Sequence, residues 1–216
     1  MLKKIGLVIF SVMVLSLGSG KFYGRGVKDV YPLHKPLQYS YNTTKDYKSP
    51  VDLMSDIIKN LDIENNERYF KTGVVYKEGK IYEIPLKEVK DFNIKPRHYN
   101  TYCNIFVIDV LNIVANTLNE GSYKIVNEPV NANTLRTKFE DSRYWEEVSE
   151  QEAISCVRGG QIVVLSYIDQ PHGHVAFVRP DSDLGNVLLW NVGRVNKNKV
   201  KWNKDYNTKY FVKVRG

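Results

Sequence analysis

The order of the predicted elements along the chain indicates an α+β protein. A strongly apolar helical pattern lies near the middle of the sequence, and four short segments rich in β-branched residues follow in its last third. Helices followed by a run of strands joined by turns are typical of this class. The 216 residues suit one compact core, and 43% hydrophobic with 25% charged residues is an ordinary globular composition.

The first twenty residues have the pattern of an export signal. Two lysines precede an apolar run from Ile5 to Leu17, which is followed by a Gly-Ser-Gly stretch. The run is about 13 residues long, whereas spanning a membrane takes about 20. We therefore expect a signal peptide over 1–20, an irregular arm over 21–48, no stable membrane insertion after cleavage, and an extracytoplasmic protein.

The folded domain is expected over 49–216. Apolar residues at helical spacing behind a Ser-Pro start predict a helix over 50–61. Alternating residues around a Glu-Gly turn predict a small hairpin over 73–84, within an insertion at about 70–98.

The strongest helical pattern opens at Cys103, with Gly121 as its expected stop. A second helix is predicted behind the capping box of Ser149 and Glu152, ending at Gly159. Cys156 lies inside that second helix, where packing is the expected role. Antiparallel strands are predicted at 161–168, 175–179, 187–192 and 210–214.

Cys103 is the candidate nucleophile. A cysteine reacts as the thiolate, and unpaired amides at a helix start together with a nearby imidazole lower its pKa from about 8.5. The alternative is a small buried hydrophobic residue, the usual fate of a free cysteine.

His174 is the candidate base, because it opens a predicted strand directly after Gly173. His98 and His34 lie in loop-like segments, and His172 lies in a Pro/Gly turn. The alternative for His174 is a strand-end histidine with a purely structural role.

Asn191 is the candidate third group. If the strands at 175–179 and 187–192 pair about a turn centred near residue 183, Asn191 lies opposite His174 and can orient its imidazole. A structural turn former is the alternative for Asn191, and Asp181 and Asp183 are rival candidates for the orienting role.

Three segments together resemble the papain-like amidohydrolases of the NlpC/P60 and CHAP superfamily. They are TYCNIFVIDVL at 101–111, GHVAFVRP at 173–180 and LWNVGR at 189–194, with a weaker similarity at ENNERY, 64–69. The resemblance spans about residues 97–216 and implies a papain-like fold, in which the helix carrying the nucleophile packs on an antiparallel sheet.

The resemblance implies cleavage of amide bonds in peptidoglycan, with Cys103 as nucleophile, His174 as base and Asn191 as orienting residue. The backbone amide of Cys103 is an expected oxyanion donor. The residues expected to contact the substrate are Asn100, Tyr102, Asn104 and Trp190.

Two other function classes stay open: a wall-binding protein of the same fold without turnover, and an exported effector that modifies proteins by acyl transfer. The net charge of +7 suits an anionic wall. The lysine-rich segment at 195–204 is interleaved with asparagines, which indicates a solvated turn rather than a nucleic-acid surface. No phosphate loop or metal-ligand spacing occurs, so no cofactor is expected.

Overall fold

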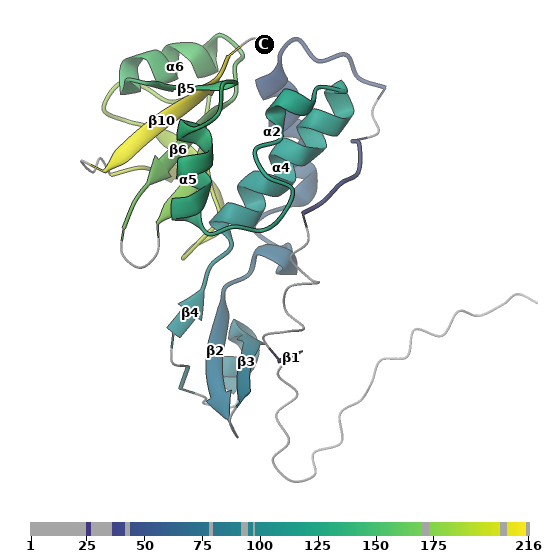
Figure 1. Cartoon of the computed structure of the whole chain (residues 1–216), viewed down its shortest axis with the longest axis vertical. Coiled ribbons are helices and arrows are strands. Elements are labelled where there is room, and N and C mark those ends of the chain that lie inside the picture. Colours follow the sequence, from purple (N-terminus) through teal and green to yellow (C-terminus); the bar gives the residue numbers. More distant parts are fainter. Residues whose placement is uncertain are drawn as a thin grey trace, which may run out of the picture.

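The computed structural model describes residues 25–26, 36–41, 44–77, 80–91, 95–96, 98–169, 173–203 and 207–214. These residues form a body of helices and a larger sheet, with a smaller sheet projecting below it (Figure 1). The α+β class is confirmed. The predicted signal peptide over 1–20 lies outside the described residues.

The elements divide between the body and the small sheet as follows. The helices are α2 (Pro50–Leu61), α3 (Leu86–Asp91), α4 (Cys103–Leu118), α5 (Ala132–Glu140) and α6 (Glu150–Arg158). The small sheet contains β1 (Arg25–Gly26), β2 (Thr72–Lys77), β3 (Lys80–Pro85) and β4 (His98–Asn100). The large sheet contains β5 (Trp145–Val148), β6 (Val163–Tyr167), β7 (His174–Val178), β8 (Leu188–Asn191), β9 (Lys197–Lys201) and β10 (Thr208–Lys213).

The large sheet has the order β5-β10-β6-β7-β8-β9 and is antiparallel throughout. Helix α4 packs on β7, and α2 packs on α4. Phe106 of α4 and Phe177 of β7 are both fully buried, with their ring centroids 5.5 Å apart in an edge-to-face arrangement. This aromatic contact fixes α4 against the middle of the sheet.

The small sheet has the order β1-β3-β2-β4 and contains the predicted hairpin. Strands β2 and β3 pair from Thr72–Pro85 to Lys77–Lys80, which confirms the hairpin strands. The Glu-Gly turn expected between them lies outside the described residues. The short link from β4 to α4 then leads directly to Cys103, so the expected insertion is connected to the start of the candidate nucleophile helix.

The predicted helices are found with small differences at their ends. The side chain of Ser49 accepts a hydrogen bond from the backbone of Asp52 at the start of α2. The capping box of Ser149 and Glu152 is present at the start of α6. Helix α4 begins at Cys103 as predicted but ends before Gly121, because Asn119 adopts the left-handed conformation (φ 53°) and closes the helix.

The segment at 195–204 was predicted wrongly, and others were not predicted. The basic stretch at 195–204 is not only a turn: it contains β9, whose side chains alternate between exposed and half-buried at the sheet edge. Helix α5 and strand β5 were missed. Trp145 at the start of β5 is buried against Phe139, with ring centroids 4.8 Å apart.

The expected irregular arm over 21–48 contains strand β1, which pairs with β3, so the prediction is wrong at 25–26. Its other described parts, 36–41 and 44–48, have no helix or strand, and 36–41 lies along α4. The backbone N–H of Leu37 donates to Asp109 Oδ1 (2.8 Å), and that of Tyr41 donates to Thr117 Oγ1 (2.8 Å). The arm therefore supports the nucleophile helix along most of its length.

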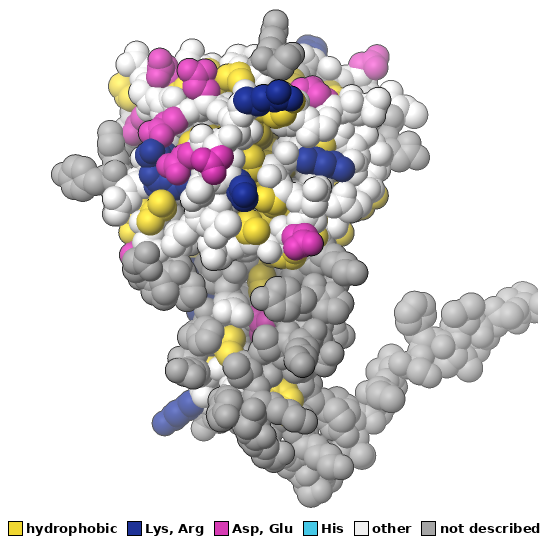
Figure 2. All heavy atoms as spheres, in the orientation of Figure 1, with side chains coloured by type: hydrophobic (Ala, Val, Ile, Leu, Met, Phe, Trp, Pro, Cys, Tyr) yellow, Lys and Arg dark blue, Asp and Glu magenta, His cyan; other side chains and the backbone are white. Residues whose placement is uncertain are grey.

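The face drawn in Figure 2 carries basic and acidic side chains side by side over the body. The excess of lysine and arginine is therefore not gathered into one patch on that face. No helix among the described residues is long and apolar enough to cross a membrane.

Candidate active site

Cys103 is the first residue of α4, and its sulfur lies beside the backbone amides of Cys103, Asn104 and Val175. Two of these amides belong to the helix start, as expected, and the third belongs to β7. The N–H dipoles of these amides favour the thiolate, but burial of the 3%-exposed residue outweighs them and raises the pKa of the thiol. The expected lowering of its pKa is therefore wrong for this structure, because desolvation is the dominant cause.

His174 is the first residue of β7 and is half-buried. Burial lowers the pKa of its imidazole, and a hydrogen bond to Asn191 partly opposes that shift. Val175, whose amide contacts the sulfur of Cys103, is the next residue along the strand. The structure thus brings the candidate nucleophile and the candidate base to the same end of the α4–β7 contact. With a raised thiol pKa and a lowered imidazole pKa, both groups are neutral near pH 7.

Asn191 fixes the tautomer of His174. Its Nδ2 donates to the carbonyl oxygen of Val195 (2.6 Å), so its Oδ1 is the atom that faces His174 Nε2 at 2.8 Å. An amide oxygen only accepts, and therefore Nε2 carries the proton in the neutral imidazole. Nδ1 is left unprotonated and is the nitrogen that can act as a base.

The contact between His174 and Asn191 arises through a different strand register from the one expected. Phe177 pairs with Trp190 and Val178 with Leu189, a shift of two residues. The turn closes later than expected, through two backbone hydrogen bonds between Asp183 and Asn186. A shift of two keeps Asn191 on the same face of the sheet, because side chains alternate with a period of two.

Trp202 was missed by the sequence reasoning. Its indole stacks on the imidazole of His174, with ring centroids 6.0 Å apart and an interplanar angle of 14°. The indole N–H donates to Thr208 Oγ1 (3.2 Å), which holds the ring in place. Its one sequence signal was an aromatic residue directly after a lysine-rich strand. Trp202 lies over the base and limits its contact with water.

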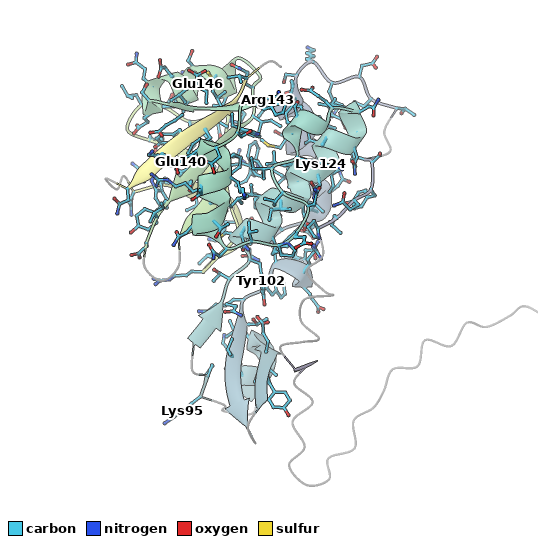
Figure 3. All side chains as sticks on the ribbon, viewed as in Figure 1. Lys95, Tyr102, Lys124, Glu140, Arg143 and Glu146 are labelled. Atoms are coloured by element: carbon cyan, nitrogen blue, oxygen red, sulfur yellow. The ribbon has the colours of Figure 1, made fainter. Side chains whose placement is uncertain are left out.

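Asn100 and Tyr102, two of the expected substrate contacts, bind Glu83 of the small sheet instead. Asn100 Nδ2 donates to Glu83 Oε1 (2.9 Å), and the hydroxyl groups of Tyr102 and Thr72 donate to the same oxygen. Figure 3 shows Tyr102 where the body meets the small sheet. Glu83 is buried, and burial together with this carboxylate raises the pKa of Tyr102. Both side chains are therefore bound to Glu83 and hold the chain in place just before Cys103.

The other two expected substrate contacts are also occupied by the protein. Asn104 Nδ2 donates to the carbonyl oxygen of Val130 (2.5 Å). Trp190 is 5% exposed, and the guanidinium of Arg179 lies 4.8 Å from its ring centroid. An indole covered in this way offers no open face to a substrate, so Trp190 is removed from the candidate site.

Asp109 is a positioning residue on α4 that the sequence reasoning did not single out. It is fully buried, and Arg68 donates to it from Nε (2.6 Å to Oδ2) and Nη2 (2.9 Å to Oδ1). The Tyr69 hydroxyl also donates to Oδ2 (2.9 Å). Arg68 and Tyr69 end the ENNERY segment, so that segment anchors the nucleophile helix through a buried ion pair.

The rest of the site offers no metal or disulfide chemistry within the described residues. No cluster of three potential metal ligands occurs among them. Cys103 and Cys156 are both free thiols. The side chain of His98 on β4 is not described, and His34 and His172 lie outside the described residues.

Comparison with known proteins adds no relative to this picture. No protein-family model matches the chain, and no curated protein matches it. The site therefore has to be interpreted from its own geometry.

Proposed function

We propose that this protein is an exported cysteine amidohydrolase that cleaves amide bonds in peptidoglycan. One observation carries the proposal: the sulfur of Cys103 lies beside the backbone amide of Val175, the residue that follows a histidine whose proton is held on Nε2 by Asn191. A helix-borne thiol next to an oriented imidazole is the arrangement that acyl transfer needs. The choice of peptidoglycan rests on the sequence resemblance and the basic net charge.

Because Cys103 and His174 are both neutral before the reaction, the thiol proton has to be removed during the attack. Nδ1 of His174 takes the thiol proton as the sulfur of Cys103 attacks the amide carbonyl, and the resulting imidazolium protonates the leaving amine. Water then releases the acyl group from the sulfur, with His174 again as base. The amides of Cys103 and Asn104 at the start of α4 are the available oxyanion donors.

The burial of Cys103 favours one competing function, a wall-binding protein that keeps the fold without turnover. A thiol with a raised pKa and 3% exposure is also what a structural cysteine would have. The two functions differ in whether bonds are cut.

Digestion of purified peptidoglycan separates them. We expect soluble fragments, identified by mass spectrometry, from the unmodified protein and at least about a thousandfold fewer from Cys103→Ala. Binding to the wall without fragments would support the competing function. Transfer of an acyl group to a protein amine, with peptidoglycan left intact, would instead indicate an effector.

A further inference from the structure

The turn between β8 and β9 contains an asparagine whose side chain joins both halves of the candidate site. Asn196 Oδ1 accepts the backbone N–H of Gly193 (3.0 Å), and its Nδ2 donates to the carbonyl oxygen of Tyr69 (2.9 Å). Both ends of the amide are therefore used, each to a main-chain group, and the side chain is half-buried. Such a two-ended contact fixes a distance between segments that are 127 residues apart in the sequence.

The Gly193 end of this bridge lies against the base. A Cβ built on Gly193 would stand 3.4 Å from Cε1 and 3.7 Å from Nδ1 of His174. The main chain of Gly193 therefore forms the wall beside the Nδ1 edge of the imidazole, the edge that Asn191 does not hold. Any movement of this wall changes the room available to the nitrogen that accepts the thiol proton.

The Tyr69 end of the bridge is fixed to the nucleophile helix. Tyr69 is fully buried, its hydroxyl donates to Asp109 of α4, and its ring packs edge-on against Phe106 with centroids 5.7 Å apart. The carbonyl oxygen that Asn196 binds thus has a set position relative to α4 and hence to Cys103.

We propose that Asn196 is a positioning residue. By linking Gly193 to Tyr69, which is fixed to the nucleophile helix, its side chain holds the main chain of Gly193 against His174. The proposal rests on the proposed function for its effect on turnover, but not for its effect on the imidazole. Without the bridge, the turn carrying Gly193 loses its tie to Tyr69, and water reaches the imidazole edge. A displacement of this kind at an acid–base group costs roughly 10- to 100-fold in rate.

The chain provides a matched control two residues further on, at the start of β9. Asn198 also binds the ENNERY segment, through its backbone N–H and its Nδ2 to Glu64 Oε1 (2.9 and 3.2 Å), so its side chain bonds to Glu64 rather than to Gly193. Asn196→Ala and Asn198→Ala each remove one half-buried amide side chain from the same strand region. Only the first removes the bridge between Tyr69 and Gly193.

The test measures the pKa of His174 by NMR titration of the full chain, with His174→Gln to assign its signal. Burial and the Asn191 bond are the causes of its shift. We expect Asn196→Ala to move the pKa upward toward its ordinary value of about 6.5, and Asn198→Ala to leave it unchanged. An unchanged His174 pKa in Asn196→Ala, or an equal change in Asn198→Ala, would overturn the proposal.

A second readout links the bridge to turnover on peptidoglycan. Asn196→Ala should lower kcat roughly 10- to 100-fold with KM little changed, because the group it positions reacts rather than binds. If the His174 pKa changes in Asn196→Ala but the unmodified protein never cleaves peptidoglycan, the role of Asn196 is supported and the proposed function is contradicted. If the unmodified protein cleaves peptidoglycan and Asn196→Ala changes neither the His174 pKa nor kcat, the proposed function is supported and the role of Asn196 is contradicted.

Discussion

The two halves of the candidate site are held in different ways. The nucleophile half, α4 with Cys103, is fixed by two buried carboxylates, Asp109 inside the body and Glu83 in the small sheet. The base half, His174 on β7, is held by an amide, an indole and a glycine wall near the surface. Changes in the nucleophile half should therefore affect the stability of the fold, whereas changes in the base half should affect the chemistry of an intact fold.

The largest effect is expected at Asp109. Asp109→Ala leaves Arg68 and the Tyr69 hydroxyl without their buried acceptor, which should lower the free energy of unfolding by about 3–5 kcal/mol. Urea denaturation measures this loss. The control is Asp183→Ala, which breaks an ion pair to Arg158 between side chains 65% and 51% exposed and should cost less than about 1 kcal/mol. Equal losses in the two variants would contradict the role of Asp109 as a buried anchor of the nucleophile half.

The next effect is expected at Glu83. Glu83→Ala removes the common acceptor of Thr72, Asn100 and Tyr102, and should cost about 1–3 kcal/mol in unfolding free energy. Glu83→Gln keeps a carbonyl oxygen in that place and should recover part of the loss. Thermal unfolding of the three proteins gives the ranking, and a Gln variant as unstable as the Ala variant would show that the shared oxygen does not hold the junction.

In the base half, Asn191→Ala should change stability by only about 1 kcal/mol, because a half-buried neutral hydrogen bond is lost. The same bond raises the pKa of His174, so its loss should lower that pKa further. NMR titration of the imidazole measures the direction. A rise in pKa would mean that the Asn191 oxygen does not stabilise the imidazolium.

Trp202→Ala should shift the His174 pKa in the opposite direction. Removing the stacked indole admits water to the imidazole and relieves the desolvation that lowers its pKa. Trp202→Phe keeps a ring over the base and serves as the control, with a smaller shift. Opposite pKa shifts in the Asn191 and Trp202 variants would distinguish the hydrogen bond that orients the imidazole from the indole that shields it from water.

The smallest effect on stability is expected at Asp181, which belongs to neither half of the candidate site. Arg179 and Lys199 lower the pKa of Asp181 to about 2. The stability from these two ion pairs is present above the ordinary carboxyl pKa of about 4 and is lost as the pH falls toward 2. Because Asp181 is 39% exposed, solvent screening limits the contribution to less than about 1 kcal/mol. Asp181→Asn should flatten the stability profile between these pH values only slightly, and a large change in acid stability would be unexpected.

Local patterns were enough to predict the main helices and strands. Ser49 and Ser149 carry cap signals that act within a few residues, so the starts of α2 and α6 could be placed from sequence. The contact of His174 with Asn191 survived a register shift of two because the alternation of side chains preserves the face.

The features of the candidate site that were missed depend on contacts between distant parts of the chain. The partners of Asp109 come from 40, 41 and 72 residues earlier. The side chain of Asn100 donates a hydrogen bond to a carboxylate on β3. Desolvation of Cys103 is likewise a property of the packed structure, which is why the helix start alone predicted the wrong direction for its pKa. Periodicity and capping carry no information about such pairings.

The central claim, that His174 acts on the thiol of Cys103, can be tested by alkylation with iodoacetamide above pH 6.5, followed residue by residue by mass spectrometry. Cys156, which is partly exposed on α6, serves as the internal reference in each sample. The account predicts that His174→Ala slows labelling of Cys103 and leaves labelling of Cys156 unchanged. Equal labelling of Cys103 with and without the imidazole would contradict the pair and leave Cys103 as a packed structural thiol.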